Sequence, residues 1–116
     1  MAKSTFVLKE PNAKTKTPIY VVFRWEDNSL KISTKQKVNP EYWNTDKQRV
    51  KTTIKVSNHN EINKELSSIE SILNKIFEKF IERFDRKPIK EEIKNLFDLE
   101  YFQKNPQFKK VEHKRE

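Results

Sequence analysis

The chain has 116 residues, of which 34% are hydrophobic and 36% charged, and its formal net charge at pH 7 is +8. This length allows one compact domain with short extensions and a small core. No apolar run is long enough to cross a bilayer, and the first residues lack the apolar stretch of a secretory signal. The absence of cysteine excludes disulfides and fits a cytoplasmic protein, and the absence of glycine excludes a glycine-rich phosphate loop. Any positive backbone φ is therefore expected at Asn or Asp.

The positive charge is concentrated in the first half of the chain. Residues 1–57 carry twelve Lys and Arg against five Asp and Glu, whereas residues 58–100 carry eight against ten and residues 101–116 five against two. Lysines used only for solubility would be spread evenly. The concentration therefore favours a polyanionic partner, with nucleic acid as the first candidate.

Three strands are predicted, at Ser4–Lys9, Pro18–Trp25 and about Leu30 to Lys35. Each alternates apolar and polar side chains, so each has one buried and one exposed side. The side chains expected to point inward are Phe6, Leu8, Ile19, Val21, Phe23, Trp25, Leu30 and Ile32. A turn is expected at Glu26–Ser29, with Asp27 and Asn28 best able to take left-handed geometry.

The segment after the third strand is predicted to fold back under the sheet. Asn39 and Pro40 are typical of a cap followed by the first helical position, and a single turn there would bring Trp43 beneath the sheet. The remainder, residues 44–56, is expected to be a loop with a short extended piece at Val50–Val56.

A long helix is predicted over residues 58–84, starting with a capping box of Asn58 and Glu61. Its apolar stripe consists of Ile62, Leu66, Ile69, Leu73, Ile76 and Phe80, widening toward Phe77, Ile81 and Phe84. A helix of this length spans roughly 39 Å and a seven-residue strand only about 23 Å, so the wide end needs a second cover. After a break at residues 86–88, Lys90–Phe97 is predicted to form a short helix that offers Ile89, Ile93, Leu96 and Phe97.

These elements predict an α+β fold in which a three-stranded antiparallel sheet packs against one long helix, followed by a short second helix. Residues 1–57 form the sheet with its basic face and loop, and 58–84 form the supporting helix of the same domain. Residues 85–100 form the short helix, and 101–116 are expected to be a mobile tail.

The sequence offers no reaction centre. His59 and His113 are far apart in the sequence, and the carboxylates of Glu65, Glu70, Glu78 and Glu82 fit a solvated helix surface. We therefore expect no catalytic residues, no metal and no cofactor in this chain.

Basic side chains interleaved with a tyrosine and a hydroxyl give the more specific signal. The candidate DNA-binding residues are Lys9, Lys14, Lys16, Tyr20, Arg24, Lys31, Ser33, Lys35 and Lys37. Arg24 suits a bidentate contact to guanine, and the lysines suit phosphates. Tyr20 fits a half-buried strand aromatic as well as a contact residue. Lys37, Lys47, Arg49 and Lys51 could extend this surface, although a solvated loop explains them equally well.

Several short motifs resemble the N-terminal arm-type DNA-binding domain of tyrosine recombinases, the phage and conjugative-transposon integrases, particularly their Bacteroidetes branch. The motifs lie within residues 4–84 and are Pro18–Val21, Leu30–Thr34, Lys37–Pro40, Trp43, Gln48–Val50, and Ile62 and Asn63 with Leu66. Asn28 and Lys35 stand where this family commonly has glycine, so local turn geometry is expected to depart from the family pattern.

The resemblance implies a non-catalytic module of a DNA recombination and integration protein from a mobile element. Its sheet would enter the major groove of double-stranded arm-type sites and position the recombinase. The catalytic tyrosine and its Arg/His/Arg set belong to a separate domain, and the short second helix would lead toward a core-binding domain. Other protomers would be contacted through domains outside this chain, so the isolated domain is expected to be a monomer with no membrane partner.

Two alternatives stay open from the sequence. The stripe from Leu66 to Phe80 could pair with a helix of another protein, which would make the chain a protein-interaction module. Single-stranded nucleic acid or RNA would require several outward aromatics for stacking, and only Tyr20 qualifies.

Overall fold

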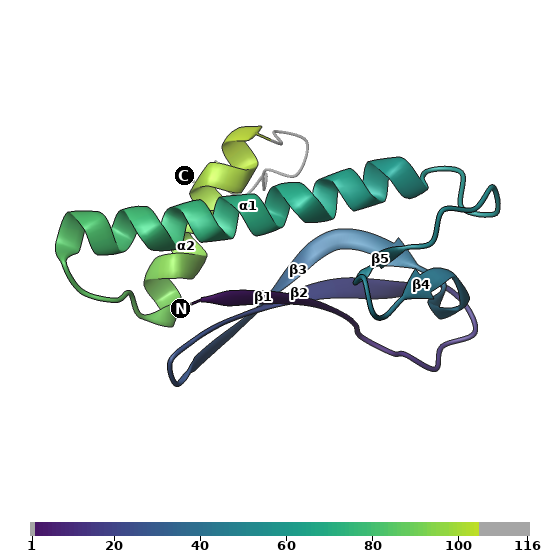
Figure 1. Ribbon diagram of the computed structural model, residues 1–116, viewed down its shortest axis with the longest axis horizontal. Helices are drawn as coiled ribbons and strands as arrows, with labels where there is room; N and C mark the ends of the chain where they lie inside the picture. Colours follow the sequence, from purple (N-terminus) through teal and green to yellow (C-terminus); the bar gives the residue numbers. More distant parts are fainter. Residues whose placement is uncertain (1, 105–116) are drawn as a thin grey trace, which may run out of the picture.

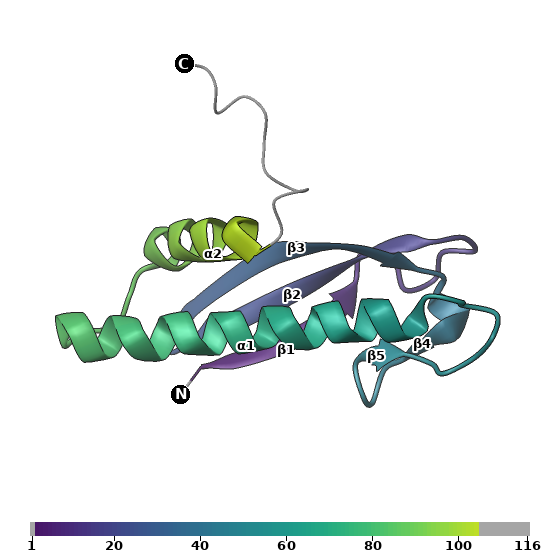
Figure 2. The same cartoon turned by 90° about the horizontal axis from the view of Figure 1, so that it is seen from above.

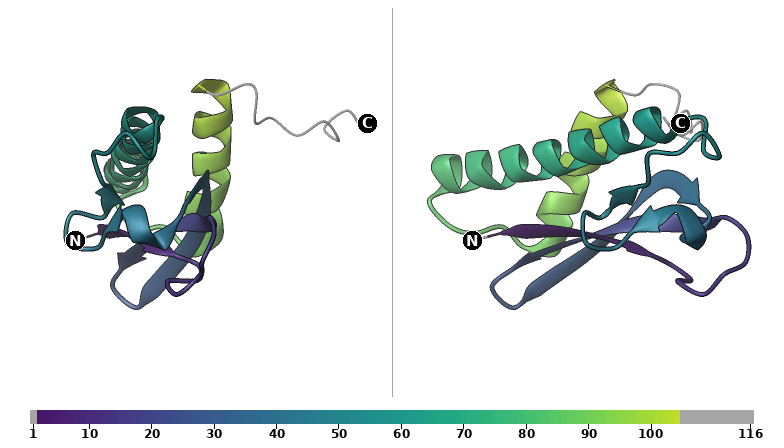
Figure 3. Two further views of the ribbon diagram at one scale, coloured as in Figure 1. Left: turned by 90° about the vertical axis from the view of Figure 1, so that its right-hand side faces the viewer. Right: turned by 45° about the vertical axis from the view of Figure 1, so that its right-hand side comes forward.

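The computed structural model describes residues 2–104, with side chains up to Tyr101. Three strands form an antiparallel sheet in the order β1-β2-β3. Both helices lie on one side of this sheet, which leaves the other face open (Figures 1 and 3). The elements are β1 (Lys3–Leu8), β2 (Thr17–Trp25), β3 (Asn28–Val38), the 3₁₀ turn η1 (Pro40–Tyr42), β4 (Trp43–Asn44), β5 (Arg49–Val50), α1 (His59–Phe84) and α2 (Lys90–Lys104). The predicted α+β fold class is confirmed.

The core lies between the sheet and α1. The four inward residues of β2 are at most 1% exposed, and the six residues of the predicted α1 stripe are all buried. Phe23 meets Phe77 of α1 edge-to-face, with ring centroids 5.8 Å apart. Seen from above, α2 lies beside α1 and next to β3, so it supplies the second cover that the helix length requires (Figure 2).

A β-bulge lengthens β3 beyond its predicted end at Lys35. Tyr20 pairs with Ser33 but Ile19 pairs with Gln36, so Thr34 and Lys35 are extra residues on β3. The fully buried Thr34 hydroxyl donates to the Ile19 carbonyl at 2.7 Å and accepts from the Gln36 N–H at 3.2 Å. The strand continues past this bulge to Val38.

Positive φ angles occur where the sequence did not predict them. Glu26, Lys35 and Gln48 adopt positive φ, and of the four such residues in the described part of the chain only Asp85 is the expected Asn or Asp type. The turn contains two residues, Glu26 and Asp27, since Trp25 pairs with Asn28. The local hydrogen bonds outweigh the residue preference, as the Ser33 hydroxyl accepting from the Lys35 N–H at 3.2 Å illustrates.

The fold-back after β3 follows the prediction in part. The Asn39 side chain accepts from the Glu41 N–H at 3.0 Å, Pro40 begins η1, and Trp43 is buried. The predicted extended piece at Val50–Val56 is wrong, because only Val50 belongs to a strand. Asn63 of α1 binds both backbone groups of Val50, which ties this short strand to the helix.

The start of α1 also differs from the prediction. Asn58 is the cap residue, but its side chain makes no capping hydrogen bond, so the predicted capping box does not form. Phe84, expected to widen the buried stripe, is 51% exposed. It lies at the last position of α1, before Asp85 turns left-handed and ends the helix.

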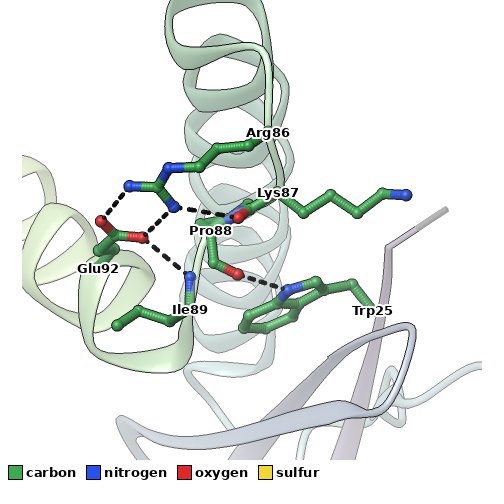
Figure 4. Close-up of polar contacts among 6 residues, drawn as sticks. All are labelled: Trp25, Arg86, Lys87, Pro88, Ile89 and Glu92. Atoms are coloured by element: carbon green, nitrogen blue, oxygen red, sulfur yellow. Dashed lines mark hydrogen bonds and ion pairs between the residues drawn. The ribbon is translucent and has the colours of Figure 1, made fainter.

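The connection between the helices is anchored to the sheet and to α2 (Figure 4). The Trp25 indole N–H donates to the Pro88 carbonyl at 2.9 Å. Glu92 accepts from the Ile89 N–H at 2.9 Å, which is the backward half of a capping box for α2. Arg86 binds both oxygens of the same carboxylate, at 3.0 and 2.8 Å. The hydrogen bond from Arg86, followed by that from Ile89, lowers the pKa of Glu92 to about 2.

α2 is longer than predicted and uses a different face. Ile93 and Phe97 are buried as expected, but Ile89 and Leu96 are exposed. Tyr101, assigned to the tail by the sequence, is buried and stacks on Phe97 with centroids 5.2 Å apart. Its hydroxyl donates to the Glu65 carboxylate of α1, and burial followed by this carboxylate raises the pKa of Tyr101. The rest of the expected tail, from residue 105, lies outside the described residues.

Replacing Thr34 by Val tests the bulge. Thr34→Val keeps the side-chain shape but leaves the Ile19 carbonyl without its hydroxyl partner. The free energy of unfolding should fall by about 1–3 kcal/mol in urea denaturation. Thr5→Val is the matched control, since Thr5 is half-buried on β1. Equal stability of the two variants would contradict this assignment.

Replacing Glu92 by Gln tests the helix connection through its pH dependence. The folded pKa of about 2 lies below the ordinary value of 4.5. The ionised carboxylate therefore stabilises the fold above pH 4.5, and this contribution is lost as pH falls toward 2. The stability difference between wild type and Glu92→Gln should shrink over that range in denaturation at stepped pH. Glu91→Gln should show no such convergence, because Glu91 is exposed and has no ion-pair partner among the described residues.

Candidate nucleic-acid interface

The open face of the sheet, turned away from α1 and α2, carries three rows of side chains. Residues directly opposite each other on antiparallel strands share a face. The register therefore places together the rows Lys3–Arg24–Ser29, Thr5–Val22–Lys31 and Val7–Tyr20–Ser33. Arg24, Lys31 and Ser33, predicted from three separate positions in the sequence, lie on this one face.

Tyr20 and Lys31 contact each other on the open face. The Lys31 ammonium lies 4.9 Å from the centre of the Tyr20 ring, a cation–π distance. Tyr20 is half-buried, so it both covers the strand and leaves part of its ring exposed. The ring thereby restrains Lys31, which keeps its charge exposed to solvent.

Lys35 projects from the bulge at the edge strand. It is exposed, its φ of 67° is left-handed, and it has no paired residue on β2. Ser33 uses its oxygen to accept from the Lys35 N–H, and its hydroxyl hydrogen remains a donor for another group. The Ser33–Lys35 pair therefore combines a hydroxyl donor and a cation at one place.

The other predicted lysines lie near the opposite end of the sheet from Arg24. Lys9 follows β1, and its backbone N–H donates to the Pro18 carbonyl at 3.0 Å. Lys14, Lys16 and Lys37 line one cavity at the end where β2 begins. The nine candidates thus form a central group on the strands and an outlying group at this end.

Sequence reasoning missed two cations near this surface. Lys3 stands opposite Arg24. The alternation of β1 could have predicted this, because Lys3 is two residues from Thr5 and therefore lies on the same face. Lys55 lines the same cavity as Lys37, but it comes from an irregular loop. No periodic pattern in the sequence assigns Lys55 to that place.

Arg49 belongs to the support of the sheet. Its guanidinium binds Ser67 and Glu70 of α1, at 3.1 and 3.2 Å, and lies 5.0 Å from the centre of the buried Phe6 ring. The Lys51 ammonium donates to the Glu41 carbonyl at 3.1 Å. Arg49 is therefore neither part of the open face nor a solvated loop residue, and it ties the β4–β5 hairpin to α1.

In the described part of the chain, the basic residues that stabilise the fold take part in ion pairs, whereas the candidate DNA-binding residues do not. Within residues 2–101, the ion pairs are Arg49–Glu70, Arg86–Glu92, Lys87–Glu26 and Lys94–Asp98. None of them includes a cation of the three rows or of the nine candidates. The positive charge of this surface is thus left available for an anionic ligand.

The structure argues against the two alternatives, pairing with a helix of another protein and binding of single-stranded nucleic acid or RNA. The α1 stripe is buried within the fold, with Leu66 and Leu73 fully covered, so it is not free to pair with another helix. Within the three rows of the open face, Tyr20 is the only aromatic residue. Stacking of several unpaired bases would need more than one.

Comparison with known families identifies the class of this domain. A family model described as an Arm DNA-binding domain matches residues 6–97, most of the chain. The chain belongs to this family. It is accordingly a DNA-binding module, and this domain is non-catalytic. The match covers nearly all of the sheet, all of α1 and the first half of α2.

Comparisons with curated proteins and with solved structures identify no related protein. In the described part of the chain, no helix has the length and apolar character needed to span a membrane.

Replacing Lys35 by Gly distinguishes an effect on protein stability from an effect on DNA binding. Glycine accepts positive φ without the left-handed penalty of about 1–2 kcal/mol, at an entropic cost of about 0.5–1 kcal/mol. Lys35→Gly should therefore unfold at an equal or slightly higher urea concentration. Its DNA affinity should fall, with the slope of log K against log salt less steep by about 0.9.

Asp85→Gly is the control, since Asp85 has a similar φ but lies at the end of α1. It should keep or raise stability and leave DNA binding unchanged. A Lys35→Gly protein that binds DNA like wild type would remove Lys35 from the interface.

Proposed function

We propose that this chain is the arm-binding module of a tyrosine recombinase, an integrase of a mobile element. It inserts the open face of its sheet into the major groove of duplex DNA at arm-type sites. There it helps to place the recombinase in a synaptic complex, and its motifs point to a parent of the Bacteroidetes branch. The observation that carries the proposal is that Lys3, Arg24 and Lys31 share one face of the sheet, and none of them takes part in an ion pair within the described residues.

The dimensions of the sheet favour insertion into the groove. Three strands about 4.8 Å apart make a layer roughly 10 Å across, and the major groove is about 12 Å wide. The strands can therefore run along the groove with the open face toward the base edges. The helices remain outside, because both lie on the other side of the sheet (Figure 3).

The side chains of the open face divide by chemistry into two roles. Arg24 is exposed and has a planar fork that matches the O6 and N7 atoms of guanine. Lys3, Lys31 and Lys35 carry compact ammonium charges that suit phosphates. Val7, near the half-buried Tyr20, offers an apolar surface of the kind that contacts thymine methyl groups.

Binding at different salt concentrations tests the proposal. A preferred sequence is first selected from a randomised duplex pool. Affinity for that duplex should then fall steeply as salt rises, because each phosphate contact contributes about −0.9 to the slope. Affinity that does not respond to salt, or tighter binding to single strands of the same sequence, would contradict the proposal.

Variants of Arg24 and Lys31 test the two roles. Arg24→Lys keeps the charge but loses the fork, so it should reduce the preference for the selected sequence by about 1–3 kcal/mol while nearly preserving the salt slope. Lys31→Ala should weaken all sequences alike and lower the slope by about one unit. Lys79→Ala, on the exposed side of α1, is the control and should change neither quantity. Equal effects of Arg24→Lys and Lys79→Ala would exclude base recognition by Arg24.

A further inference from the structure

A basic cavity lies at the end of the sheet where β2 begins. Its volume is about 380 Å³, and its lining includes four lysines from three separate segments. Lys14 and Lys16 come from the loop before β2, Lys37 from the end of β3, and Lys55 from the loop before α1. The fold thus gathers charges that are up to 41 residues apart in the sequence.

The cavity is lined by apolar residues as well as by these lysines. Val38 and Ile62, both buried, form part of the cavity wall, so the site is more than a flat cluster of surface lysines. Asn39 stabilises one wall, since its side-chain amide donates to the Lys14 carbonyl at 3.3 Å. The loop that carries Lys14 is therefore tied to the end of β3.

The charges in this cavity are not neutralised by the protein. No Asp or Glu is among the lining residues, and none of the four lysines takes part in an ion pair within the described residues. Like charges that share one cavity repel one another to the extent that salt does not screen them, and the screening length is about 8 Å at physiological salt. An anion bound among them would relieve this repulsion.

The position of the cavity connects it to the open face. Lys37 stands opposite Pro18, and Ser33 opposite Tyr20, along the same pair of strands. A duplex lying along the strands would pass from the Tyr20 row toward Lys37. The sugar–phosphate backbones border the major groove, so lysines at the end of the strands are placed where they could reach a phosphate.

We propose that this cavity binds a backbone phosphate of the DNA duplex that occupies the open face, with Lys55 as a ligand contributed from outside the sheet. The proposal rests on the proposed function. It adds a phosphate site at the end of the sheet where β2 begins, which would hold that end against one DNA strand without reading its sequence.

The test measures duplex binding of the full chain with Lys55 changed. Lys55→Gln should weaken binding roughly 5- to 10-fold at 0.1 M salt, equally for all sequences, and make the salt slope less steep by about 0.9. Lys55→Glu should weaken it further. Lys47→Gln is the matched control, because Lys47 is also an exposed loop lysine but does not line the cavity.

The outcomes separate this proposal from the proposed function. If wild type binds duplex DNA and Lys31→Ala weakens it, but Lys55→Gln equals Lys47→Gln, the phosphate site is wrong and the proposed function stands. If wild type shows no salt-dependent duplex binding, both fail. Loss of folding is checked by urea denaturation of each variant, and Lys55→Arg, which keeps the charge, should bind like wild type.

A second measurement distinguishes the source of the phosphate. The backbone amides of Lys55 and Val56 should shift on adding duplex DNA, and millimolar inorganic phosphate should not reproduce those shifts. Saturation of these amides by inorganic phosphate, with no response to DNA, would indicate a site for a free anion and overturn the proposal.

Discussion

The division of β2 into a buried and an exposed side is the constraint on which the rest of the structure depends. Ile19, Val21 and Phe23 are fully buried, whereas Arg24 is exposed. A shift of the pairing by one residue would turn Arg24 into the core and the apolar side chains into solvent. The packing against α1 therefore fixes the register, and the register fixes which cations share the open face.

Charge is used in two distinct ways across this fold. Arg49 and Arg86 each pair with a carboxylate and also lie over aromatic rings, so they strengthen contacts between elements. The cations of the open face have no such acidic partners within the described residues. The net positive charge is thus concentrated on the face that we propose as the DNA contact of this Arm DNA-binding domain.

Much of this arrangement could be predicted from the sequence, because periodicity reports burial directly. The alternation in Pro18–Trp25 and the stripe from Ile62 to Phe80 located the two halves of the core, and the charge distribution indicated the partner. The bulge at Thr34 and Lys35 was not predictable in this way. It depends on hydroxyl hydrogen bonds, and a lysine at positive φ contradicts residue preference.

Long-range contacts account for the other differences. Tyr101 is buried in the core, where it stacks on Phe97 and donates to Glu65 of α1, and nothing within the sequence near residue 101 signals the contact with Glu65. Phe84 is exposed at the last position of α1, where the left-handed turn at Asp85 ends the helix. Lys55 joins the basic cavity only because an irregular loop returns to the end of β3.

Backbone amide shifts on titration with duplex DNA test the central claim most directly, because they report on every described element at once. The account predicts the largest changes in residues 20–24 and 29–35, with small changes in residues 66–80 of α1. Changes concentrated on the exposed side of α1, with β2 and β3 unaffected, would contradict it.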